Sequence, residues 1–185
     1  MKGVCKICGC TMKNPCFSHK YGFCWWPTER TEEICSHCYY QDIKDDPNVI
    51  HCVHGLEFPV LTVHQPYALM LVKGVKKIEY RNWKLPQQYV GQRIFIHAGR
   101  DLHCDWDKHY SDEEPFYQCR DEALAKDLSQ MILGSVVFGE SQGPFDGIKY
   151  GAPCKMYEWP VTDPIRLNVP MKFIPGKQRI WKIQF

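Results

Sequence analysis

The sequence predicts an α+β protein: a small β-barrel whose ends are plugged by short helices, preceded by an N-terminal zinc-finger module. Two observations lead to this prediction. Seven cysteines fall within the first 38 of 185 residues, and the rest of the chain is a series of short apolar, β-branched segments separated by Pro and Gly. We expect the module to occupy residues 1–50 and the barrel domain to occupy residues 56–185.

Composition sets limits on the class of protein. Hydrophobic residues make up 44% and charged residues 24% of the chain, a balance that excludes collagen, coiled coils and disordered chains. No run of about eighteen apolar residues is present. The N-terminal MKGVCKICGC does not resemble a signal peptide. We therefore expect a cytoplasmic protein without membrane contact.

The first cysteines form two CxxC pairs, Cys5-Lys-Ile-Cys8 and Cys35-Ser-His-Cys38. In a reducing compartment, clustered cysteines bind metal rather than form disulfides. Two such pairs complete a closed tetrahedral zinc site, whose role is structural because no position is open to water. The predicted metal ligands are Cys5, Cys8, Cys35 and Cys38.

Three further cysteines of the module, Cys10, Cys16 and Cys24, fall outside these pairs. They could replace a cysteine of the CxxC pairs as a ligand, bind a second ion together with His19 or His37, or be buried free thiols. The sequence does not decide between these alternatives.

The run CKICGCT…W…ICSHC resembles the treble-clef zinc fingers of the GATA type, in which a helix follows the second cysteine pair. The segment Ser36–Lys44 would supply that helix, and Asp46-Pro47 would end it. GATA fingers bind DNA with basic flanks, which this segment lacks, so RNA is favoured over DNA.

The barrel domain begins with a strand at Val60–Val63. Gln65-Pro66 starts a short helix that ends at Gly74, and residues 76–83 are extended. The spacing of Ala123, Leu124, Leu128 and Ile132 predicts a helix over Arg120–Ile132. The other predicted strands are Arg93–Ala98, Ser135–Gly139, Lys155–Trp159 and Arg179–Phe185.

The segment Leu61-Thr-Val-His-Gln-Pro-Tyr-Ala68, followed by Gly74-Val-Lys76-Lys-Ile-Glu79-Tyr-Arg81, resembles the ASCH domain, whose hallmark is GxKxxExR. Later pieces fit the same pattern in order: Ile96-His97-Ala98, Gly134–Glu140, Tyr157–Pro160 and Gly176–Ile183. The likeness spans about residues 58–185.

This resemblance implies a PUA-like barrel and a role with RNA or modified nucleosides. It places the GxKxxExR segment in a cleft between barrel and helix. Some small members of the family act as amidohydrolases on acylated cytidines, and others have been described as cleaving RNA.

Glu79 and Arg81 are two residues apart, so on a strand they share a face. The convergence of Lys76 with them is implied by the resemblance. Lys76 could hold a phosphate or act as a base, Arg81 could bind a phosphate or a base edge, and Glu79 could accept from an exocyclic amine or act as a general base. The alternative is a buried ion network that only fixes the barrel.

Residues around the motif extend the predicted nucleic-acid site. Seven Lys or Arg and a single acid, Glu79, lie between residues 73 and 100, which favours an anionic ligand but also fits a solvated surface. Tyr67 and Tyr80 are assigned to the core, and Trp83 is the candidate for base stacking. The complete predicted set is Gln65, Lys76, Glu79, Arg81, Trp83 and His97. The acidic segment from Asp101 to Pro115 could flank the cleft or form a lid.

The sequence therefore predicts a protein that binds single-stranded RNA or a modified nucleoside, with a structural zinc finger. A small hydrolase using Lys76 and Glu79 as catalytic residues is the first alternative. It is disfavoured because the amidohydrolase members have a threonine where this chain has Glu79. A protein-docking module without chemistry of its own is the second. Whether the chain is an enzyme stays open.

Overall fold

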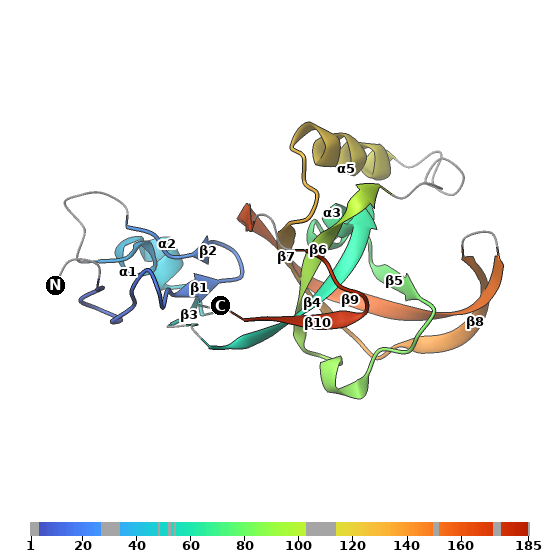
Figure 1. Ribbon diagram of the computed structural model, residues 1–185, viewed down its shortest axis with the longest axis horizontal. Helices are drawn as coiled ribbons and strands as arrows, with labels where there is room; N and C mark the ends of the chain where they lie inside the picture. Colours follow the sequence, from blue (N-terminus) through green and yellow to red (C-terminus); the bar gives the residue numbers. More distant parts are fainter. Residues whose placement is uncertain are drawn as a thin grey trace.

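The computed structural model describes residues 4–26, 34–47, 49–51, 53, 55–102, 114–149, 152–171 and 175–184. Within these residues the protein is a mixed α+β structure, mostly strands with four short helices (Figure 1). No helix in this described part is long and apolar enough to cross a membrane. Most of the acidic segment from Asp101 to Pro115 lies outside it.

The N-terminal part contains a small antiparallel sheet with the strand order β2-β1-β3. Its strands are β1 (Phe17–Ser18), β2 (Gly22–Phe23) and β3 (Val49–Ile50). The helix predicted over Ser36–Lys44 is present as two short helices, α1 (Ser36–Tyr39) and α2 (Gln41–Lys44). They are separated because the backbone of Tyr40 is extended, with φ −83° and ψ 125°.

The larger part is built on one sheet with the order β10-β4-β6-β7-β9-β5, and β8 pairs with β9. Strands β4 and β6 are parallel, and every other neighbouring pair is antiparallel. The path has two ends, β10 and β5, and no ladder joins them in the described residues. In the described residues the strand pairing therefore shows a mixed sheet, without a ladder that would close it into the barrel expected from the sequence. The strand bounds are β4 Glu57–Gln65, β5 Ile78–Arg81, β6 Arg93–Leu102, β7 Ile132–Phe138, β8 Gln142–Lys149, β9 Ala152–Met171 and β10 Ile180–Gln184.

Helix α3 (Tyr67–Val72) follows β4 directly, as the Gln65-Pro66 pattern predicts. Gly74 follows the end of α3 and has a φ of +72°, a conformation that glycine adopts without steric cost. A short 3-10 helix, η2 (Gln87–Tyr89), precedes β6.

The predicted helix over Arg120–Ile132 is wrong in its bounds. Helix α5 runs from Glu114 to Ala125, and Ile132 is the first residue of β7. Two positive φ angles, at Asp127 and Gln130, turn the chain out of the helix before the apolar spacing is complete. The buried face of α5 is formed by Phe116, Cys119 and Ala123, whereas Leu124 points to solvent.

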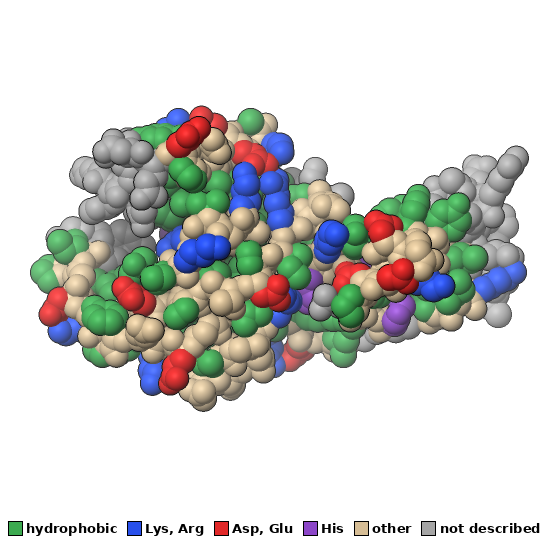
Figure 2. Space-filling model, turned by 180° about the vertical axis from the view of Figure 1, so that it is seen from behind, with side chains coloured by type: hydrophobic (Ala, Val, Ile, Leu, Met, Phe, Trp, Pro, Cys, Tyr) green, Lys and Arg blue, Asp and Glu red, His purple; other side chains and the backbone are tan. Residues whose placement is uncertain are grey.

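The N-terminal module projects from one side of the larger body (Figures 1 and 2). An apolar cluster joins the two, with the Phe17 ring 5.4 Å from Phe95 and 6.1 Å from Phe58. The Asn168 amide also donates to the Lys20 carbonyl at 3.2 Å. The module is thus packed against strands β4, β6 and β9 through buried side chains.

Candidate nucleic-acid interface and metal centre

The turn after α3 delivers the motif residues to the edge strand β5. The amides of Val75 and Lys76 both donate to the carbonyl of Met70, at 2.9 and 3.1 Å. The chain then enters β5, which pairs antiparallel with β9 so that Glu79 lies opposite Trp159. Because Trp159 is buried, this register places the Glu79 side chain on the inner side of the strand.

Lys76, Glu79 and Arg81 converge as the resemblance implied. Lys76 Nζ lies 3.4 Å from Glu79 Oε2, and Arg81 Nε lies 2.8 Å from Glu79 Oε1. Arg81 also donates through Nη2 to the Thr62 carbonyl at 3.0 Å, and Lys76 donates to the Ile78 carbonyl. The side chain of Glu79 is only 6% exposed, against 11% for Lys76 and 19% for Arg81. A buried carboxylate thus holds two cations, and the group carries one net positive charge.

Two tyrosines flank the Lys76 ammonium. Its Nζ lies 4.9 Å from the ring centre of Tyr80 and 5.8 Å from that of Tyr67. Tyr67 packs against the main core, as expected, but the assignment of Tyr80 to the core is wrong, since that residue is 45% exposed. Burial and the neighbouring Glu158 raise the pKa of the Tyr80 hydroxyl. Tyr80 therefore offers an accessible aromatic face beside a cation.

Two basic residues that the sequence reasoning missed lie close to the motif. The Arg179 guanidinium is 5.8 Å from the ring centre of Trp83, and Lys177 Nζ is 5.7 Å from that of Trp181. Trp181 donates through Nε1 to Thr62 Oγ1 at 3.1 Å, and the Thr62 carbonyl is the acceptor for Arg81. The available signal was the pair of basic residues just before Trp181, which the sequence reasoning used only to recognise the domain.

Trp83 is half-buried and packs edge-on against Trp159, with ring centres 4.6 Å apart. His97 is buried on β6, edge-on to Trp181 at 5.9 Å. Trp83 therefore lies just after the motif strand, whereas His97 is fully buried in the sheet and offers no surface to a ligand.

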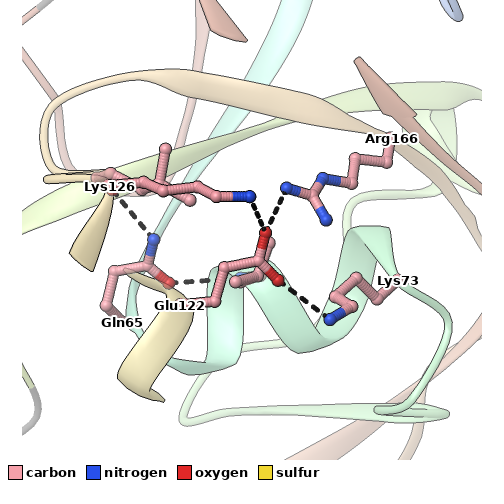
Figure 3. Close-up of polar contacts among 7 residues, drawn as sticks. Gln65, Lys73, Glu122, Lys126 and Arg166 are labelled. Carbon is pink, nitrogen blue, oxygen red and sulfur yellow. Dashed lines mark hydrogen bonds and ion pairs between the residues drawn. The ribbon is translucent and has the colours of Figure 1, made fainter. Parts of the chain in front are cut away.

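The side chain of Gln65, which was predicted to bind nucleic acid, makes hydrogen bonds within the protein. Its Nε2 donates to the Leu128 carbonyl at 2.8 Å, and its Oε1 accepts from the Leu69 amide at 3.2 Å (Figure 3). The side chain is buried and ties the end of β4 to the first turn of α3 and to the segment after α5.

Figure 3 also shows a second ion cluster, centred on Glu122 of α5. Its carboxylate contacts Lys73 at 3.0 Å, Lys126 at 2.8 Å and Arg166 at 2.6 Å. Hydrogen bonds from Arg166 and Lys126 lower the pKa of Glu122 to about 2. Because the three cations come from the end of α3, from α5 and from β9, this cluster fixes α5 to the body.

The N-terminal cysteines gather around one point. The thiols of Cys5, Cys8, Cys10 and Cys35 all lie within 4.8 Å of one another, and those of Cys8 and Cys35 are 3.8 Å apart. Cys38 follows in α1, and its thiol interacts with those of Cys8 and Cys35. This group of soft, closely spaced thiols could hold a metal ion.

The remaining cysteines of the module lie in the same cluster. Cys10, Cys16, Cys24 and Cys35 form a second group within 4.8 Å, and Cys8, Cys16 and His51 form a third. The imidazoles considered from the sequence are elsewhere. His37 Nε2 lies 3.1 Å from the Gly22 carbonyl, and the His19 ring stacks on Phe95 at 4.8 Å. His51, which the sequence reasoning did not consider, lies beside the cysteines, with its Nδ1 3.1 Å from Cys16 Sγ.

Comparison with protein families identifies the domain. A sequence model of the ASCH domain matches residues 61–169, which is more than half of the chain and includes every motif residue described above. A search of curated proteins finds no significant match.

Proposed function

Because this chain belongs to the ASCH domain family, which is associated with RNA binding, we propose that it binds single-stranded RNA or a modified nucleoside beside the GxKxxExR motif. The proposed ligand-binding surface, called the motif surface below, consists of Lys76, Glu79, Tyr80, Arg81, Trp83, Lys177 and Arg179. We further propose that the body has the PUA-like fold and that Cys5, Cys8, Cys35 and Cys38 hold a structural zinc ion.

The observation that carries the proposal is the nearly buried carboxylate of Glu79, which holds two cations at fixed positions. A guanidinium held in one orientation suits a phosphate or the edge of a base, because its donors form a planar fork. Lys177 and Arg179 add positive charge nearby. A phosphate backbone is attracted to such a surface in a salt-dependent manner.

Aromatic rings between these cations support a single-stranded ligand. Tyr80 is exposed and Trp83 is half-buried, each with a cation near its ring. Stacking of an unpaired base on such a ring contributes about 1–3 kcal/mol, whereas paired bases offer no free face. Unpaired bases or free nucleosides therefore fit this surface better than a duplex.

The geometry favours binding over hydrolysis. Each oxygen of Glu79 already faces a cation. A general base needs a carboxylate oxygen that can accept a proton from the substrate, and both oxygens of Glu79 are engaged in ion pairs. Lys76 is likewise engaged by Glu79 and by the Ile78 carbonyl. The motif residues are arranged to hold and orient a ligand.

Fluorescence anisotropy with a labelled single-stranded RNA tests the proposal, at two salt concentrations and with a denaturing gel of each sample. Lys76→Gln and Lys177→Ala should each weaken binding about tenfold, because each removes one cation from the motif surface. Lys126→Ala, on α5, removes the same charge elsewhere and should leave binding unchanged. Equal affinities for all four proteins would exclude this surface, and cleavage that Lys76→Gln abolishes would favour the hydrolase.

The structural zinc is tested by its effect on folding. Zinc-bound thiolates contribute their binding free energy to the fold of a small module. A strong chelator should therefore expose residues 4–51 to protease and leave the body intact. A Cys5→Ser/Cys38→Ser protein with undiminished zinc and an unchanged melting profile would disprove this ligand set.

A further inference from the structure

We propose that Cys10, Cys16, Cys24 and His51 form a second zinc site, next to the one formed by Cys5, Cys8, Cys35 and Cys38. This inference goes beyond the proposed RNA-binding function and does not depend on it. The second site brings together residues from four separate places in the module.

The register of the small sheet aligns three of the four proposed ligands. Phe17 of β1 lies opposite Phe23 of β2 and opposite Ile50 of β3. Continued by one residue, the same antiparallel register sets Cys16 opposite Cys24 on one side and opposite His51 on the other. Residues directly opposite each other in antiparallel strands project from the same face of the sheet. One end of the sheet thus presents two thiols and an imidazole side by side.

The contacts between these residues agree with this register. The Cys24 amide donates to the Cys16 carbonyl at 2.9 Å, and the Cys16 amide approaches Cys24 Sγ at 3.2 Å. His51 Nδ1 lies 3.1 Å from Cys16 Sγ. The Val53 amide donates to the Pro15 carbonyl at 3.0 Å, which holds the chain after His51 against the residue before Cys16.

Cys10 supplies the fourth ligand from the loop after the first CxxC pair. Its Sγ lies 3.6 Å from that of Cys24, and all three thiols of the proposed site lie within 4.8 Å of one another. The loop is fixed, because the Cys5 amide donates to the Cys10 carbonyl at 2.9 Å. Tetrahedral zinc with bonds of about 2.3 Å to sulfur requires ligand atoms about 3.8 Å apart, close to these separations.

The number of donors matches two ions. Seven cysteines and His51 provide eight donors, and two separate tetrahedral sites need eight. A single ion would leave three thiols, of which those of Cys10 and Cys16 are buried, and an imidazole packed together without a ligand role. Two ions divide the donors into a four-cysteine site and a site of three cysteines and one histidine, both common for structural zinc. None of the described cysteines is in a disulfide, so all seven are available.

Zinc content of the purified full-length chain, measured by native mass spectrometry and atomic emission, tests the proposal. Wild type should contain two zinc ions, and Cys24→Ser and His51→Gln should each contain one. His51 is exposed, so its substitution removes a ligand without opening the core. His51→Cys restores a zinc ligand and should again hold two. Cys154→Ser and His64→Gln, which change a cysteine and an exposed histidine of the body, should also keep two.

The results separate this proposal from the first zinc site. Wild type with one zinc ion that persists in Cys24→Ser and His51→Gln, but is lost in Cys35→Ser, would overturn the second site and leave the first. Two ions in both Cys24→Ser and His51→Gln would also overturn it. A wild-type chain without zinc would overturn both sites.

Discussion

Glu79 and Arg81 lie two residues apart on β5 and form an ion pair of 2.8 Å, in which the carboxylate side chain is only 6% exposed. Strand geometry alone brings them to one face, since residues i and i+2 share a face. The pair is also tied to β4, because Arg81 donates to the Thr62 carbonyl. The motif thus has two roles: it attaches the edge strand β5 to β4, and it holds the cations of Lys76 and Arg81 in place.

Arg81→Ala should lower the free energy of unfolding by about 2–4 kcal/mol, because it leaves a buried carboxylate with one cation instead of two. Chemical denaturation with urea measures the change. Lys77→Ala, an exposed neighbour on the same segment, should cost less than about 0.5 kcal/mol. Equal losses in the two variants would show that the ion pair contributes nothing specific.

Gly74→Ala should destabilise the protein by about 2–3 kcal/mol, because two penalties add at this position. Its φ is +72°, and an added Cβ would lie 2.8 Å from Pro164 Cγ. Gly91→Ala is the matched control, with a φ of +75° and open space around the new Cβ, and should cost about 1–2 kcal/mol. A Gly74→Ala protein no less stable than Gly91→Ala would argue against the close approach of Pro164.

The Glu122 cluster makes stability depend on acid pH. Hydrogen bonds from Arg166 and Lys126 lower the pKa of Glu122 from 4.5 to about 2 in the folded protein. Its contribution is therefore present above pH 4.5 and is lost as the pH falls from 4.5 towards 2.

Glu122→Gln should accordingly be less stable than wild type by about 1–2 kcal/mol at pH 7, and the difference should disappear near pH 2. Urea midpoints across this range measure it. Asp121→Asn, at an exposed neighbouring position, should show no such convergence. A pH-independent difference for Glu122→Gln would contradict the ion-pair explanation.

His19 links stability to pH in a different range. Burial, with a smaller effect of Arg93, lowers the pKa of His19 from 6.5 to about 4. Between these values the unfolded chain binds a proton that the folded protein does not, so stability falls as the pH decreases from 6.5 to 4. His19→Phe, which retains a ring against Phe95, should remove this part of the pH dependence. An unchanged slope between pH 6.5 and 4 would assign the dependence to another group.

Much of the fold could be predicted because local patterns determine it. The predicted strand at Arg93–Ala98, the Gln65-Pro66 start of α3 and Gly74 at its end all agree with the structure. The predicted bounds of the helix over Arg120–Ile132 were wrong because the apolar spacing continues past the end of the helix. At Asp127 and Gln130 the backbone has positive φ angles and leaves helical geometry. Strand β8 was not predicted, since its Gly and Pro residues are untypical of strands and its pairing with β9 stabilises it.

The sequence also predicted the convergence of Lys76, Glu79 and Arg81, because a short motif on one strand contains all three. Arg179 and His51 were missed for the opposite reason. Each lies beside residues of a distant segment, brought there by the pairing of β10 with β4 and of β3 with β1, and no local spacing reports such a contact. Lys177 was missed although its contact with Trp181 is local.

The twenty-residue strand β9 pairs with β5, β7 and β8 along its length. The ladders with β5 and β7 meet at the centre of β9, near Pro160 and Val161, so its central amides should exchange with solvent only when the whole body unfolds. The motif strand β5 should be similarly resistant to local opening, because it is hydrogen-bonded to β9. A ligand would meet cations that are already ordered, and little conformational entropy would be lost on binding.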